Sequence, residues 1–182
     1  MPVKPTRAEL QAAASKTVPD VIAPGLRVLF CGINPGLYSA AIGHHFGRPG
    51  NRFWPALYAG GFTPRLFSPY DEADLLSLGL GIVSLVDRAS LAADELTTEE
   101  LVAGAQRLAV KVAQFQPHWV AILTIGLYRR AFGRPQAQLG PQPEMIVGSR
   151  LWLLPNPSGL NAHYSPMALG KLFSTFREAV KE

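Results

Sequence analysis

Short apolar runs that alternate with helical patterns constrain the fold of this chain most. The runs are rich in valine, leucine and isoleucine, and helix-start signals or helical spacing lie between several of them. Strands that alternate with helices in this way favour an α/β fold with a largely parallel central sheet. The runs expected to form strands are Arg27–Gly32, Gly81–Val86, Trp119–Thr124 and Arg150–Leu154.

Two of the expected helices have clear start signals. Thr97-Thr98-Glu99-Glu100 has the pattern of a capping box, which predicts a helix that begins there and ends at Gln116-Pro117. Ser165-Pro166 predicts the start of the last helix. The shorter expected elements are a helix capped by Asn51 that ends at Gly60-Gly61, helices over 71–78 and 127–132, a loop over 37–50, and a hairpin or bent pair around Gly148-Ser149.

The length of 182 residues suits one domain with its own core and is short for two. We expect residues 21–182 to form this domain and residues 1–20 to be a basic N-terminal arm, either mobile or loosely helical. Cys31 is the only cysteine, so an internal disulfide is excluded and a cytoplasmic location is favoured. We find neither a signal peptide nor an apolar run close to the roughly 20 residues of a membrane span.

The charges are unevenly distributed along the chain. The net charge is +4, and the stretches 21–70 and 101–143 contain basic residues but no acidic residue. Most acidic residues lie in 71–74 and 87–100. Such segregation can create a positive face that attracts a polyanion such as a nucleic acid. A solvated basic surface without a partner would have the same pattern.

Two of the expected strands are followed by a similar turn. Residues 33–37 read Ile-Asn-Pro-Gly-Leu, and residues 156–160 read Asn-Pro-Ser-Gly-Leu. A residue before proline is extended, so Asn34 and Asn156 continue past the ends of their strands. Because ligands bind beyond the carboxyl ends of parallel strands, both amides are expected to face one crevice, where they could orient a water or read a base edge. The alternative is two turns in which each side chain bonds only nearby backbone.

Several other catalytic motifs are missing from the sequence. The first turn has neither the glycine spacing of a dinucleotide fingerprint nor the lysine of a phosphate loop. His44-His45 has no partner set with metal-ligand spacing, so no metal site is predicted. There is no Gly-x-Ser-x-Gly elbow of a serine hydrolase, and Ser158 has no obvious base.

The ordered motifs resemble those of the mismatch-specific uracil-DNA glycosylases, bacterial relatives of thymine-DNA glycosylase. The resemblance runs from about residue 22 to about residue 180 and implies a single glycosylase domain, a three-layer α/β/α sandwich. It implies an enzyme that flips uracil out of G·U-mismatched duplex DNA and hydrolyses its N-glycosidic bond without a metal or cofactor, as a monomer in the bacterial cytosol. The motifs are Gly32-Ile33-Asn34-Pro35-Gly36-Leu37, Asn51-Arg52-Phe53-Trp54, Leu85-Val86-Asp87-Arg88 and Asn156-Pro157-Ser158-Gly159-Leu160.

The resemblance also implies roles for individual residues. Asn34 corresponds to the family's water-positioning asparagine, and Phe46 to an aromatic residue that stacks on the flipped base. The other residues expected to bind the substrate are Ile33 and Phe46 through their backbone, Gly36, Ser39 near the pyrimidine C5, and Asn156. The residues expected to contact DNA are Ser158 at a phosphate, Gly159 and Leu160 as a wedge in the duplex, and His163.

The chain departs from the family pattern at two places. Ser84 stands where some relatives carry a lysine, and Asn161-Ala162-His163-Tyr164 stands where an arginine is common in the wedge. We expect His163 or Tyr164 to take the place of that arginine. Because an amide is a weak base, a carboxylate is expected to assist it. We hypothesise that Asp94 is this carboxylate and assists water activation. Asp87 is the other candidate, with an ion pair to Arg88 as its alternative role.

Two other functions remain open from the sequence. One is a module that binds mismatches or lesions without catalysis. The other is a hydrolase of free nucleosides, against which the segregated charges and the wedge motif argue, because a small ligand needs neither.

Overall fold

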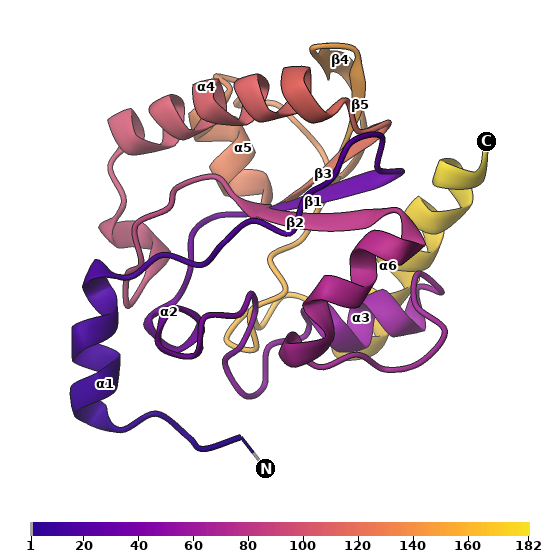
Figure 1. Cartoon of the computed structure of the whole chain (residues 1–182). Coiled ribbons are helices and arrows are strands. Elements are labelled where there is room, and N and C mark those ends of the chain that lie inside the picture. Colours follow the sequence, from indigo (N-terminus) through magenta and orange to yellow (C-terminus); the bar gives the residue numbers. More distant parts are fainter. Residues whose placement is uncertain (1) are drawn as a thin grey trace.

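The computed structural model describes residues 2–182 and contains a five-stranded sheet in the order β2-β1-β3-β5-β4 (Figure 1). All neighbouring strands are parallel except β4 and β5, which form an antiparallel hairpin. The prediction of an α/β fold with a largely parallel sheet is therefore confirmed, as is the hairpin at Gly148-Ser149. The strands are β1 (Val28–Gly32), β2 (Leu80–Ser84), β3 (Trp119–Leu123), β4 (Gly140–Ile146) and β5 (Ser149–Leu154).

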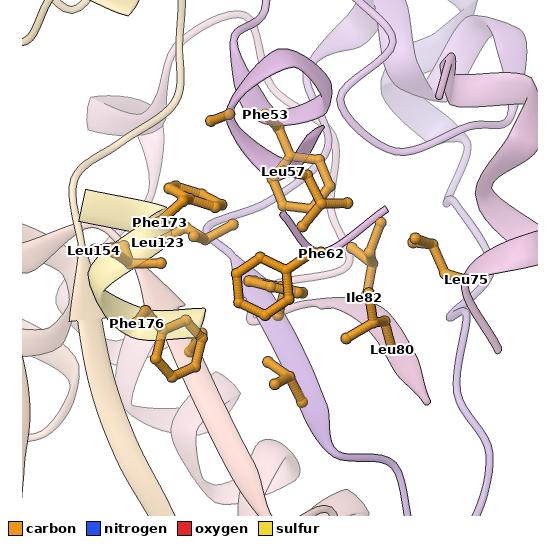
Figure 2. Close-up of a cluster of buried hydrophobic side chains, with 14 of the residues drawn as sticks. Phe53, Leu57, Phe62, Leu75, Leu80, Ile82, Leu123, Leu154, Phe173 and Phe176 are labelled. Carbon is orange, nitrogen blue, oxygen red and sulfur yellow. The ribbon is translucent and has the colours of Figure 1, made fainter. Parts of the chain in front are cut away.

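Helices cover both faces of the sheet and give the expected three layers. Side chains of α3, α6 and the 3₁₀ helix η2 pack on one face, and those of α4 and α5 pack on the other. Figure 2 shows the first of these clusters, which contains helix residues such as Phe53 and Phe173 and strand residues such as Ile82. The helices are α1 (Arg7–Ala12), α2 (Leu37–Ile42), α3 (Phe53–Ala59), α4 (Thr98–Phe115), α5 (Ile125–Ala131) and α6 (Pro166–Lys181), with the 3₁₀ turns η1 (Ala13–Ser15), η2 (Pro69–Leu78) and η3 (Ala93–Glu95).

Strand β1 is buried on both sides, as expected of a central parallel strand. Phe30 contacts the aromatic cluster below α3 and α6, whereas Cys31 points into the cluster below α4 and α5. Burial raises the pKa of the Cys31 thiol to about 12. The thiol is therefore a core side chain and not a reactive group.

The helix-start signals correspond to real caps. The Thr97 hydroxyl accepts from the Glu100 N–H at 3.1 Å, and the Ser165 hydroxyl accepts from the Ala168 N–H at 3.1 Å. The Asn51 side chain accepts from the Phe53 N–H at 2.9 Å, at the start of α3. The capping predictions at α4 and α6 are confirmed, because each rested on a side chain that bonds a free backbone N–H. Asn51 bonds the first N–H of α3 from one residue before the N-cap, which is Arg52.

The prediction of a loop over 37–50 is wrong in its first half, where α2 forms. Gly43 suggested a loop, but it adopts the left-handed conformation (φ 75°) that ends a helix. The segment Leu-Tyr-Ser-Ala-Ala-Ile before it contains no helix breaker. Gly43 therefore marks the end of a helix and not the middle of a loop.

The N-terminal segment is helical, which is one of the two expected states. Thr6 caps α1 through the Glu9 N–H, and Ala13 and Val18 are buried against Ala40 in a small cluster. The division of the chain near residue 20 stays a prediction. Among the described residues, no helix is both long and apolar enough to cross a membrane.

The sheet order places the functional turns together. The connection from β1 leads to β2 on one side, and the chain then crosses to β3 on the other side of β1. In parallel sheets such a reversal opens a crevice at the carboxyl ends of the strands. Asn34 follows β1 and Asn156 follows β5, so both turns emerge at that edge.

Candidate functional site

A cavity of about 290 Å³ lies at the carboxyl edge of β1, β3 and β5. This volume is at the lower end of the range of roughly 300–1,000 Å³ for small-molecule pockets, and it suits a single base or nucleoside. Eight of the sequence-predicted residues line it: Ile33, Asn34, Gly36, Ser39, Phe46, Asn156, Ser158 and Leu160. Residues without a predicted binding or catalytic role also line it, among them His45, Arg48, Asn51, Ser90 and Leu91.

The Asn34 side chain is held by the loop that follows β2. Its Nδ2 donates to the Arg88 carbonyl and to the Ser90 hydroxyl, both at 2.8 Å. The Ser90 hydroxyl donates its own proton to the Ala92 carbonyl at 2.8 Å, so its oxygen must accept from Asn34. Both Asn34 N–H groups are used, and Oδ1 has no donor within residues 2–182. This network fixes the amide with an acceptor left for a ligand or a water.

The local-turn alternative is therefore wrong for Asn34. Its partners lie 54 and 56 residues away in the sequence, on the loop after a neighbouring strand. Ser90 is 4% exposed, and its N–H also donates to the Pro35 carbonyl at 3.2 Å. The first Asn-Pro turn and the loop after β2 thus form one bonded unit.

Arg88 ties this unit to the start of α4. Its guanidinium contacts the Glu100 carboxylate at 2.8 and 3.1 Å, and this contact, with the Thr97 N–H, lowers the pKa of Glu100 to about 2. The ion pair that we had considered between Asp87 and Arg88 is thus formed with Glu100 instead. The Glu100 carboxylate of the α4 capping box points back at the loop that carries Arg88. The sequence pattern of a capping box does not reveal this contact.

Phe46 forms an aromatic wall of the cavity. Its ring stacks on Phe53 with centroids 4.1 Å apart, and it lies over Gly32, where an added Cβ would be 3.2 Å from the ring. The backbone of Phe46 has a φ of 51°, which a non-glycine residue adopts rarely and at a cost of about 1–3 kcal/mol. Within residues 2–182 its N–H has no acceptor, so it is a free donor beside the cavity.

Ser39 and Gly36 shape the same side of the cavity. Ser39 is 5% exposed, and its hydroxyl accepts from the Gly47 N–H at 2.9 Å, which braces the loop that carries Phe46. Gly36 is exposed at the start of α2, and a Cβ there would meet nothing within 4 Å. The protein's own packing therefore does not require glycine here, and the predicted role of Gly36 in substrate binding stays a prediction.

The second Asn-Pro turn has a partly local role. The Asn156 Oδ1 accepts from the Ser158 N–H at 2.9 Å, which is the local turn considered from the sequence. Its Nδ2 has no acceptor within residues 2–182, and the residue lines the cavity. Asn156 is thus a turn residue that also offers amide donors to a ligand.

Leu160 and Gly159 lie at the rim of the cavity. Leu160 is 74% exposed, and its role as a wedge stays a prediction. A Cβ on Gly159 would lie 2.4 Å from the Gly50 carbonyl oxygen, so this position requires glycine for close backbone contact. The turn after β5 therefore packs directly on the loop before α3.

Arg52 holds this rim loop, a role that sequence reasoning missed. Its Nη1 donates to the carbonyls of Asn161 at 3.0 Å and Tyr164 at 2.6 Å, and Nη2 lies 3.5 Å from the Gly159 carbonyl. The Arg52 N–H also donates to the Pro157 carbonyl at 2.8 Å. The motif Asn51-Arg52-Phe53-Trp54 was a signal for it, but only the fold shows that its target is the loop after β5.

Three predicted residues lie outside the cavity. His163 is exposed on the rim loop and Asp94 is exposed in η3, beside the cavity-lining Ala93. Asp87 is exposed and does not line the cavity. No carboxylate is among the lining residues in the described part of the chain. No group of three or more histidine, cysteine or acidic side chains with metal-site geometry occurs within residues 2–182.

His45 is a buried residue of the cavity wall. Its Nε2 lies 2.8 Å from the Pro19 carbonyl, and its backbone N–H donates to Glu72 at 2.9 Å. A carbonyl only accepts, so Nε2 carries a proton. Burial lowers the pKa of His45 below its ordinary value, against smaller opposite effects of the Pro19 carbonyl and of Glu72 and Asp20, and the nearby His44 adds a small lowering.

This lowered pKa predicts that the fold loses stability in mild acid. The unfolded chain protonates His45 near pH 6.5 whereas the folded chain resists it, so the unfolding free energy should fall as the pH drops below about 6.5. Urea unfolding of wild type and His45→Gln over this range measures the effect, and the variant should show the smaller pH dependence. The exposed His118→Gln is the matched control. Equal slopes in wild type and His45→Gln would contradict this assignment.

Comparisons with known proteins identify the family and the fold of the chain. The family described as the uracil DNA glycosylase superfamily matches residues 19–182. Among solved structures, the chain resembles the solution NMR structure of a candidate uracil DNA glycosylase from Methanosarcina acetivorans, with a TM-score of 0.61 and 16% sequence identity. The match covers 92% of this chain and 98% of that one. At this identity the likeness shows a shared fold.

Proposed function

The chain belongs to the uracil DNA glycosylase superfamily, and from this premise we propose that it excises uracil from DNA, chiefly from G·U mismatches. The observation that carries the proposal is the orientation of Asn34. An amide whose N–H groups are both bonded to fixed acceptors presents its oxygen to the cavity. That oxygen can hold one water for attack, which is what a glycosylase without a bound metal needs.

The proposed reaction is hydrolysis of the bond between the sugar C1′ and the uracil N1. The bond electrons leave with N1, the water oxygen bonds to C1′, and one water proton passes to solvent, so that the products are an abasic site and the uracil anion. Asn34 Oδ1 accepts a hydrogen bond from the water, and this bond orients the water so that a lone pair of the water oxygen points at C1′. Positioning accounts for the role of Asn34, because an amide does not take up the proton itself.

The cavity supports recognition of a pyrimidine. Phe46 lines the cavity and can stack on the base there, a contact worth about 1–3 kcal/mol by analogy with other base–aromatic contacts. The Phe46 N–H can donate to the negative charge that develops on the departing base. Buried Ser39 lies in the same wall, and a methyl group on C5 of thymine would have to fit beside it.

The rim supports a duplex substrate. The exposed Leu160 side chain can fill the gap that a flipped nucleotide leaves in the base stack. Extraction of a base costs least at a mismatch, which gives G·U an advantage over A·U. Arg48 is exposed and lines the cavity beside this rim, so it is a candidate phosphate contact that the sequence did not single out. We further propose that the protein acts as a monomer in the cytosol.

The decisive experiment is excision from a matched set of oligonucleotides that carry G·U, A·U, G·T or single-stranded uracil. Alkali cleavage of the product reveals abasic sites under single-turnover conditions. We expect G·U to be cut fastest and binding to weaken steeply with salt. Tight mismatch binding without any abasic product would support the non-catalytic module instead. Cleavage of free deoxyuridine at a rate comparable to G·U would support a nucleoside hydrolase.

A further inference from the structure

A second exposed leucine lies at the mouth of the cavity. Leu91 is 78% exposed and Leu160 is 74% exposed, and both line the cavity. Single exposed leucines are ordinary on protein surfaces. Two of them at the rim of one cavity need a reason, and the sequence motifs account only for Leu160.

The backbone on both sides of Leu91 is fixed. The Ser90 N–H donates to the Pro35 carbonyl at 3.2 Å, and the Ala92 N–H donates to the Glu95 carboxylate at 3.0 Å. The Ser90 hydroxyl bridges Asn34 and the Ala92 carbonyl. Leu91 is thus an apolar side chain that is exposed to solvent while its backbone is held in a defined place. This is the arrangement of a preorganised contact.

The bonded network indicates what Leu91 meets. Ser90, its neighbour, holds the amide of Asn34, and under the proposed function the attacked C1′ lies beside the water on Asn34 Oδ1. The next residues along the cavity wall are Leu91, Ala92 and Ala93, which are all apolar. Resting on that function, we propose that Leu91 packs on the deoxyribose of the flipped nucleotide and fixes its sugar against this wall.

This contact is separate from the wedge. Leu91 follows β2 and Leu160 follows β5, with β1 and β3 between them in the sheet. At roughly 4.8 Å per strand spacing, the two loops start about 14 Å apart. Under the proposal, Leu160 enters the gap in the duplex, and Leu91 touches the strand that carries the uracil.

A comparison of single-stranded with duplex DNA distinguishes the proposed sugar contact of Leu91 from the wedge contact of Leu160. Leu91→Ala should weaken affinity about fivefold to thirtyfold for oligonucleotides with 2′-fluoro-2′-deoxyuridine, an uncleavable uracil nucleotide. The loss should be the same for single strands and for G·U duplex. Leu160→Ala should weaken only the duplex complex. Leu91→Met should restore most of the affinity, because it returns the apolar volume. Val110→Ala, on α4 and 67% exposed, is the matched control outside the cavity.

Each outcome bears on a separate claim. If Leu91→Ala binds both substrates like Val110→Ala, the sugar contact is wrong while excision by wild type would still support the proposed function. A loss confined to duplex DNA would place Leu91 in the base stack and overturn its assignment to the sugar. If wild type neither binds nor cuts uracil DNA, the proposed function and the Leu91 contact fail together. A wild type that binds but does not cut leaves the affinity comparison decisive for Leu91 alone.

Discussion

Replacement of Asn34 by alanine is expected to slow uracil excision about 10²- to 10⁴-fold, a range typical of loss of a positioned catalytic group. The reason is that, under the proposed function, Oδ1 of Asn34 accepts from the attacking water, and the bonds of its Nδ2 to Arg88 and Ser90 fix its orientation. Affinity for uncleavable G·U duplex should change little, because the water contact acts on the chemical step. Single-turnover rates and titration of labelled duplex measure the two quantities.

Two further variants test the same arrangement. Ser90→Ala removes one of the two acceptors that orient Asn34 and should give a smaller loss in rate than Asn34→Ala.

Asp94→Asn tests the hypothesis that Asp94 assists water activation. Its exposure outside the cavity predicts a rate close to wild type. A large loss with Asp94→Asn and none with Asn34→Ala would reverse the proposed roles.

Replacement of Arg52 by glutamine is expected to reduce excision from G·U duplex about tenfold to a hundredfold. Arg52 donates to carbonyls of the loop that carries Leu160, so its loss should release this loop and, under the proposed function, the Leu160 wedge. Single-stranded uracil needs no wedge and should be cut at close to the wild-type rate. The ratio of the duplex rate to the single-strand rate is therefore the measurement.

Arg27→Gln is the control for this prediction. Arg27 also donates its guanidinium N–H groups to a backbone carbonyl, that of Leu78, at the opposite end of β1 from the cavity. It should leave the ratio of duplex to single-strand rates unchanged. If Arg52→Gln lowers both rates equally, its role is general stability and not the position of the loop.

The sequence predicted those features that depend on local chemistry. The caps at Thr97 and Ser165 bond their own helices, and the buried strands are apolar along their length, so both are visible in a short window. The direction of Asn34 past its strand followed from proline in the same way. The cavity-lining positions of eight residues rested on the family resemblance and on the edge rule for parallel sheets.

Contacts between distant segments were beyond sequence reasoning. The partners of Asn34 lie on the loop after β2, and those of Arg52 lie on the loop after β5. No spacing rule connects these segments, because their meeting depends on the strand order. His45 and Glu72 are a similar case, since a charged side chain bonded to a buried backbone N–H has no periodic signal.

The braced loop at Phe46 affects when the pocket takes its shape. Its unfavourable backbone conformation is set when the protein folds, and Ser39 and Phe53 hold it there. A pocket of this kind does not have to assemble at each encounter with DNA. Under the proposed function, a flipped base would enter a pocket whose shape is already set, so its recognition would cost no rearrangement of this loop.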